Sequence, residues 1–88
     1  MKIKSGFIKR TVGGKIIAVA VGERCKDFDG MITLNHMAGF IWDKLEKDVT
    51  SEEIIAAILK EYDTTREQAE KDVATFIENL REKGLLDE

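Results

Sequence analysis

The chain of 88 residues contains no proline, one cysteine and one histidine. It has no apolar run near the roughly 20 residues that a membrane-spanning helix needs, and residues 1–5 lack the apolar stretch of a signal peptide. Because the lone Cys25 has no partner for an intrachain disulfide, the sequence is typical of a cytoplasmic protein. We therefore expect one cytoplasmic domain over residues 1–88, with no membrane partner.

Few side chains in this chain are suited to catalysis. A nucleophilic Cys25 would need a neighbouring base, and His36 is the only imidazole available to it. A zinc site would need clustered Cys and His residues, which are missing. Gly13-Gly14 joins two apolar runs instead of opening a helix, as a phosphate-binding loop would. We predict a protein that is not an enzyme, with no catalytic residue, metal or cofactor.

Charge is distributed unevenly along the chain. The net charge of −3 combines +4 over residues 1–34 with −7 over residues 35–88. A nucleic acid would therefore have to avoid the acidic second part of the chain.

The first 34 residues have the pattern of three strands. The runs Phe7–Val12 and Lys15–Val21 flank Gly13-Gly14, which predicts a hairpin because glycine tolerates the positive φ of tight turns. Since Lys15–Val21 is almost entirely apolar, it is expected to be a central strand or a strand covered on both faces. A polar loop, Gly22–Gly30, then leads to a short third strand, Met31–Leu34.

The remaining residues have the pattern of three helices. Asn35 is a candidate N-cap for the first helix, and Thr50–Glu53 and Thr64–Glu67 are candidate capping boxes for the second and third. Gly84 is placed to end the third helix, with the apolar residues after it folding back on the core. Apolar residues at helical spacing predict these buried faces: Ala38, Ile41, Trp42 and Leu45; Ile54, Ile55, Ile58, Leu59 and Tyr62; Ala69, Val73, Phe76, Ile77 and Leu80.

Strands followed by helices indicate an α+β fold with a three-stranded antiparallel sheet, arranged as a winged helix-turn-helix whose sheet comes first. DNA binding is the obvious alternative for such a fold. However, the candidate recognition helix, Thr65–Lys83, has a net charge of −1, which is unsuited to phosphate neutralisation. A contact of the basic hairpin with nucleic acid remains an alternative, as does a structural or oligomerisation role.

Several short segments, in this order along the chain, resemble the PqqD-like family of recognition elements for ribosomally made, post-translationally modified peptides. They are Ile32–Trp42, Ser51–Ile54, Glu61–Asp63, Asp72–Phe76 with Leu80, and Gly84–Leu86. Each piece consists mostly of core and capping residues, and it is the ordered set over residues 7–86 that is specific. One departure is His36-Met37, which stands where many members have Glu-Thr. It lies at the start of the first helix, and we expect the same fold.

The resemblance implies a function. Such domains bind the leader segment of a precursor peptide as an extra strand, in a groove between the third strand and the third helix. They pass the peptide to a modifying enzyme, which is a radical SAM enzyme in several systems. The expectation for this chain is a stand-alone adaptor, a monomer or weak dimer, that binds a leader peptide and no nucleic acid.

Physical reasoning supports such a groove, since an open edge strand offers unpaired amides and carbonyls to an added strand. On the third helix, either the margin around Phe76 or the margin around Ile77 could line it. We favour the Phe76 margin because a partly exposed aromatic ring among polar residues is a plausible anchor, although Phe76 could also belong simply to the core. The predicted peptide-binding residues are Met31, Ile32, Thr33, Leu34, Asp72, Val73, Phe76, Asn79, Leu80 and Lys83.

Overall fold

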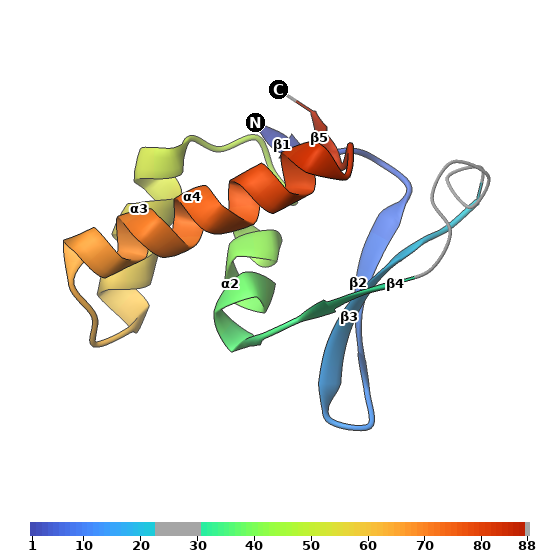
Figure 1. The fold of residues 1–88 in the computed structure, drawn as a ribbon, viewed down its shortest axis with the longest axis horizontal. Coiled ribbons are helices and arrows are strands. Elements are labelled where there is room, and N and C mark those ends of the chain that lie inside the picture. Colours follow the sequence, from blue (N-terminus) through green and yellow to red (C-terminus); the bar gives the residue numbers. More distant parts are fainter. Residues whose placement is uncertain (23–30, 88) are drawn as a thin grey trace.

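The computed structural model describes residues 1–22 and 31–87 (Figure 1). Its elements in chain order are β1 (Lys2–Ile3), β2 (Phe7–Val12), β3 (Lys15–Ala20), β4 (Met31–Leu34), α2 (His36–Lys44), α3 (Ser51–Glu61), α4 (Arg66–Glu82) and β5 (Leu86–Asp87). An antiparallel sheet followed by three helices confirms the predicted α+β class. The predicted loop Gly22–Gly30, with Cys25, lies outside the described residues except for Gly22.

The main sheet has the strand order β2-β3-β4, so β3 is central and β4 is an edge strand. Gly13 and Gly14 join β2 to β3 with φ angles of 56° and 78°. Two successive positive φ angles characterise the tight hairpin turn that matches the twist of the flanking strands. The predicted hairpin and the central position of the apolar strand are confirmed, with that strand ending at Ala20, one residue earlier than expected.

A second, two-stranded sheet was not predicted from the sequence. β1 pairs with β5 in antiparallel fashion, with Lys2 opposite Asp87 and Ile3 opposite Leu86. Figure 1 shows the two ends of the chain side by side near the end of α4. Two residues are too few to show an alternating pattern, which is why the sequence alone did not reveal these strands.

Two of the three predicted helix starts are confirmed. Asn35 caps α2, since its side-chain oxygen accepts a hydrogen bond from the Ala38 amide at 2.7 Å. Thr50 and Glu53 form a complete capping box at the start of α3. The Glu53 amide donates to the Thr50 hydroxyl at 3.2 Å, and the Thr50 amide donates to the Glu53 carboxylate at 3.0 Å.

The capping box predicted at Thr64–Glu67 is wrong. Thr65 is the N-cap of α4, and its hydroxyl accepts from the Gln68 amide at 3.1 Å. The Gln68 side chain donates to Asp72 at 2.8 Å instead of reaching back to the cap. The Thr64 amide meanwhile donates to the Tyr62 carbonyl at 3.1 Å within the preceding turn. Because the two threonines are adjacent, only the geometry of that turn decides which one caps the helix.

The end of α4 is a Schellman motif built on Gly84, which has a φ of 74°. The Gly84 amide donates to the Arg81 carbonyl at 3.1 Å, and the Leu85 amide donates to the Leu80 carbonyl at 2.9 Å. This turn sends Leu85 and Leu86 back into the core, where both are buried. The predicted glycine stop and the return of the chain are therefore confirmed.

The core lies among the helices and on one face of the main sheet, with the β2-β3 hairpin extending away from the helices (Figure 1). Trp42 is 1% exposed, as predicted. Helix α2 approaches the sheet closely at Gly39, where an added Cβ would lie 3.2 Å from Ile16 Cδ1. An ion pair of 2.6 Å between Lys9 and Asp43 also joins the hairpin to α2.

Candidate binding groove

A groove of about 570 Å³ runs between the edge strand β4 and helix α4, with α2 beneath it. Its size lies within the range of typical ligand sites. The residues that line it are Ile32, Thr33, Leu34, Asn35, Met37, Ala38, Ile41, Gln68, Lys71, Asp72, Thr75, Phe76, Asn79, Leu80 and Lys83.

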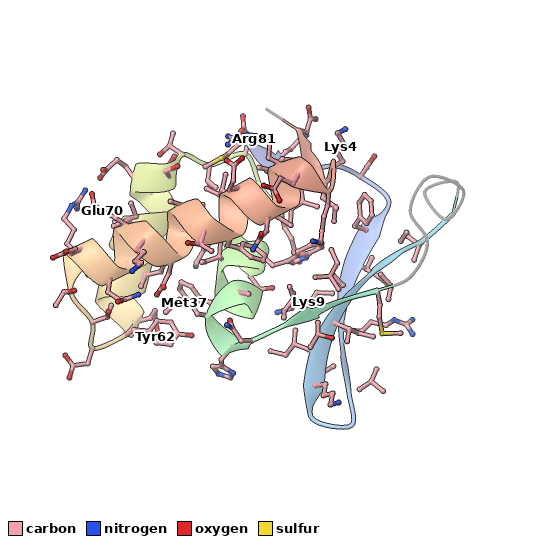
Figure 2. The ribbon with its side chains drawn as sticks, viewed as in Figure 1. Lys4, Lys9, Met37, Tyr62, Glu70 and Arg81 are labelled. Carbon is pink, nitrogen blue, oxygen red and sulfur yellow. The ribbon has the colours of Figure 1, made fainter. Side chains whose placement is uncertain are left out.

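The floor of the groove is apolar. Leu34, Ile41 and Leu80 are buried, and they come from β4, α2 and α4 respectively. Phe76 and Met37 are half-buried and pack against the core while also lining the groove. Met37 projects from α2, where it is labelled in Figure 2. Phe76 is thus neither a fully covered core residue nor a freely exposed one, and part of its ring area is available to an occupant.

The wall formed by α4 has a polar rim, made of the residues of α4 that line the groove above Phe76 and Leu80. Lys71, Asn79 and Lys83 are exposed, whereas Asp72 is half-buried and accepts the hydrogen bond from Gln68. Within residues 1–22 and 31–87, neither Lys71 nor Lys83 forms an ion pair with a carboxylate. The groove therefore combines an apolar floor with a polar rim that carries the cations of Lys71 and Lys83 and the carboxylate of Asp72.

The opposite wall is the open edge of β4, and the sheet register shows which backbone groups it offers. The Val21 amide donates to the Gly6 carbonyl at 2.8 Å, so Val21 and alternate residues of β3 direct their backbone groups toward β2. The residues between them, Ile16 and Ala18, face β4 and pair with Leu34 and Ile32. The amides and carbonyls of Met31 and Thr33 consequently point outward from the sheet edge, where an added strand would pair.

The structure brings most of the predicted site residues together at this groove. Ile32, Thr33, Leu34, Asp72, Phe76, Asn79, Leu80 and Lys83 line it. Met31 does not, because its side chain is on the opposite face of the sheet and is 62% exposed. Val73 is 2% exposed and belongs to the core. The groove lies along the Phe76 margin of α4, whereas Ile77, on the other margin, is buried.

Sequence reasoning missed two parts of the lining. The floor contributed by Met37, Ala38 and Ile41 depends on α2 lying beneath the groove, and no local sequence pattern predicts that arrangement. The second part is the polar row of α4, which includes Gln68, Lys71 and Thr75. Its signal was present in the sequence, since Gln68, Asp72, Thr75 and Asn79 recur every three or four residues and so share one side of a helix.

Elsewhere on α4, the arginines form ion pairs with neighbouring carboxylates. The Arg66 guanidinium lies 2.6 Å and 2.7 Å from the two carboxylate oxygens of Glu52, which raises the pKa of Arg66 above its ordinary value. Arg81 lies 2.8 Å from Glu78. These pairs reduce the positive charge that α4 could offer to phosphates.

The described residues do not meet what a metal site or a membrane-spanning helix requires. No group of three His, Cys, Asp or Glu side chains in residues 1–22 and 31–87 is placed to hold a metal ion. None of the helices described is long and apolar enough to cross a membrane. His36 is exposed at the first position of α2, as expected for a residue next to the cap.

Comparison with known proteins gives one family and two similar structures. The family described as Coenzyme PQQ synthesis protein D (PqqD) matches residues 18–86. The structure of TbiB1 in complex with the TbiA(beta) leader peptide is 26% identical, with a TM-score of 0.77 over 99% of this chain and 95% of that one. Lasso peptide synthetase B1 complexed with the leader peptide is 19% identical, with a TM-score of 0.73 over 96% of this chain and 93% of that one, and supports the fold alone. No curated protein gives a significant match.

Proposed function

Because the chain belongs to the PqqD family, we propose that it is an adaptor that binds the leader segment of a ribosomally made precursor peptide and delivers it to a modifying enzyme. The observation that carries this proposal is the groove itself. An edge strand with outward backbone groups lies opposite an apolar floor and a helix wall, which is the arrangement that strand addition requires. TbiB1, a structural relative, is itself known in complex with a leader peptide.

In this proposal the leader pairs with the backbone of Met31 and Thr33 as a further strand of the sheet. Alternate leader side chains then point to the two faces of the sheet. Those on the inner face enter the apolar floor beside Phe76 and Leu34, and they supply specificity, while backbone pairing supplies affinity with little demand on sequence. Asp72, Asn79 and Lys83 form the polar margin that the bound segment passes.

The adaptor has no chemistry of its own in this proposal and needs no cofactor. Reaction is left to the partner enzyme, for which a radical SAM enzyme is the first candidate because such enzymes serve several systems of this family. A gene for a short precursor peptide and one for a modifying enzyme next to the gene for this chain would identify the natural partners.

The critical test is Thr33→Pro, because proline removes the outward amide of the edge strand and blocks pairing there. Peptides are first selected against the wild-type protein from a displayed library of random segments, and their affinities are measured by fluorescence polarisation. We expect Thr33→Pro to weaken the selected strand-forming peptides by about tenfold or more, the equivalent of losing at least one backbone hydrogen bond. The native sheet should survive, since this amide does not face β3.

Thr11→Pro is the matched control. Thr11 lies on the other edge strand, β2, is exposed, and also has its backbone groups directed away from β3. It should leave peptide affinity unchanged, and circular dichroism should show both variants folded. If folded Thr33→Pro binds every selected peptide as tightly as the wild type, strand addition at β4 is wrong. Steep loss of binding with added salt would instead indicate phosphate-like electrostatic recognition.

A further inference from the structure

Among the residues that the structure describes, the large apolar side chains that remain exposed all lie on one face of the main sheet. Within residues 1–22 and 31–87 these are Ile8, Val12, Val21 and Met31, with exposed fractions of 36%, 57%, 38% and 62%. None of them is on a helix. Contiguous exposed apolar surface of this kind is typical of a site for another molecule.

The register places these residues together. Val19 lies opposite Ile8 on β2 and opposite Met31 on β4, so the three side chains form a row across the sheet. The helices cover the other face, where Ala18 and Leu34 are buried. We call the uncovered side the outer face. Its residues are Ile8, Arg10, Val12, Lys15, Ile17, Val19, Val21, Met31 and Thr33.

The charge on the outer face has one sign. Arg10 and Lys15 lie on it near the hairpin turn, and β2, β3 and β4 contain no acidic residue. The third cation of these strands, Lys9, points to the opposite face and pairs with Asp43. An occupant of the outer face would therefore need an apolar centre bordered by carboxylates.

We propose that the outer face is the docking surface for the modifying enzyme, and that the enzyme meets it with an apolar patch flanked by acidic side chains. This inference rests on the proposed function, because an adaptor must hold its peptide and its enzyme at the same time. The groove takes the peptide, and the outer face is the other apolar surface that the described residues leave uncovered.

Charge decides against a second copy of this chain as the occupant. A second outer face would offer no carboxylate to Arg10 and Lys15, because β2, β3 and β4 contain no acidic residue, and with the two hairpins parallel it would bring like cations together. The acidic helical surface of another copy would match in charge, but its described helices expose no large apolar side chain to cover the patch. Nucleic acid fits less well, since the centre of the outer face is apolar and offers few cations to phosphates.

The two surfaces meet at β4. A leader strand added along Met31 and Thr33 would direct alternate side chains to the outer face, next to Met31. The enzyme would then contact one continuous platform made of the adaptor sheet and the bound peptide, and the loaded adaptor would offer more surface than the empty one. Selective docking of the loaded form follows directly from this geometry.

The surface can be tested by magnetic resonance titration of the isotopically labelled protein with two designed peptides. Both are amphipathic helices of about five turns, or roughly 18 residues, with a stripe of leucine on one side; the positions that flank this stripe carry glutamate in one peptide and lysine in the other. We expect the glutamate peptide to shift the amide signals of Ile8, Ile17 and Val19. We expect the lysine peptide to bind at least about tenfold more weakly.

Two variants complete the test. The double change Arg10→Glu and Lys15→Glu should reverse the preference between the peptides. Val12→Ser, at an exposed position, should weaken the glutamate peptide by about threefold to tenfold through lost apolar contact and leave thermal unfolding unchanged. Equal affinity for both peptides, or shifts confined to the groove or the helices, would overturn the proposal.

The remaining outcomes are also decisive. A concentration-dependent dimer that Val12→Ser abolishes would make the occupant a second copy, and tighter binding of a DNA duplex to the same residues would make it a nucleic acid; either result overturns the proposal. Failure of the groove is recognised separately by the Thr33→Pro comparison. Peptide capture without outer-face binding thus refutes only this inference, and the reverse pattern refutes the proposed function.

Discussion

The helical half of this protein and its three-stranded sheet use their apolar residues in different ways. Trp42, Ile58, Leu80 and Leu85, all from the helices or the turn after α4, are no more than 1% exposed. In β2, β3 and β4, only Ala18 and Leu34 are buried, and several larger apolar side chains remain accessible. Apolar content therefore provides stability in the helical half and leaves contact surface in the sheet.

The physical reason is coverage. Each helix buries one apolar stripe in the shared core, so its polar side can face water. The main sheet has helices on one face alone, which leaves its second face and the edge of β4 uncovered. The charge follows the same division, since the strands are basic and residues 35–88 carry a net charge of −7. Recognition is accordingly expected on the sheet and its border with α4, and resistance to unfolding in the helices.

The sharpest test of this division is Trp42→Ala. Removal of a fully buried aromatic side chain is expected to lower the free energy of unfolding by about 3–5 kcal/mol, because a cavity remains where the ring packed. Urea denaturation followed by circular dichroism measures it. Val12→Ala, on the outer face, should change the same quantity by less than about 0.5 kcal/mol. Similar losses in the two variants would show that the sheet carries as much stability as the helices.

A smaller effect tests which threonine caps α4 and so stabilises the start of this helix. Thr65→Ala should lower the free energy of unfolding by about 1 kcal/mol, since the Gln68 amide loses its capping partner. Thr64→Ala is the matched control and should cost much less, because the cap is one residue further on. Chemical denaturation of both variants measures these changes. A larger loss of unfolding free energy for Thr64→Ala than for Thr65→Ala would show that the helix is capped by the box at Thr64–Glu67 after all.

The smallest effect concerns the link between the two halves. Asp43→Asn removes the ion pair between Asp43 and Lys9. Because the Asp43 carboxylate is about half exposed, this change should lower the free energy of unfolding by less than about 1 kcal/mol. The difference from the wild type should vanish at about 1 M salt, where charges are screened within roughly 3 Å. A large, salt-independent loss would mean that hairpin and helices are coupled more strongly than the exposure of this pair indicates.

Much of the fold followed from patterns that extend over three or four residues. Asn35, Thr50 and Gly84 act as caps because each hydrogen bond closes on a neighbour in the chain. Gly13-Gly14 forms the hairpin for a similarly local reason. Local reasoning failed at Thr64 and Thr65, where two equivalent caps stand side by side, and at β1 and β5, whose pairing joins the two ends of the chain.

The order of the elements, the buried stripe of each helix and the Phe76 margin as one of two possible groove walls could all be predicted from the amino-acid sequence. Three features became known only from the folded chain: this margin faces β4, α2 supplies the floor, and the amides of Met31 and Thr33 point outward. The reason is range: caps and periodicity act between near neighbours, whereas a groove depends on the packing of segments some 40 residues apart in the chain, such as Thr33 and Phe76. No local pattern encodes which faces of such segments will meet.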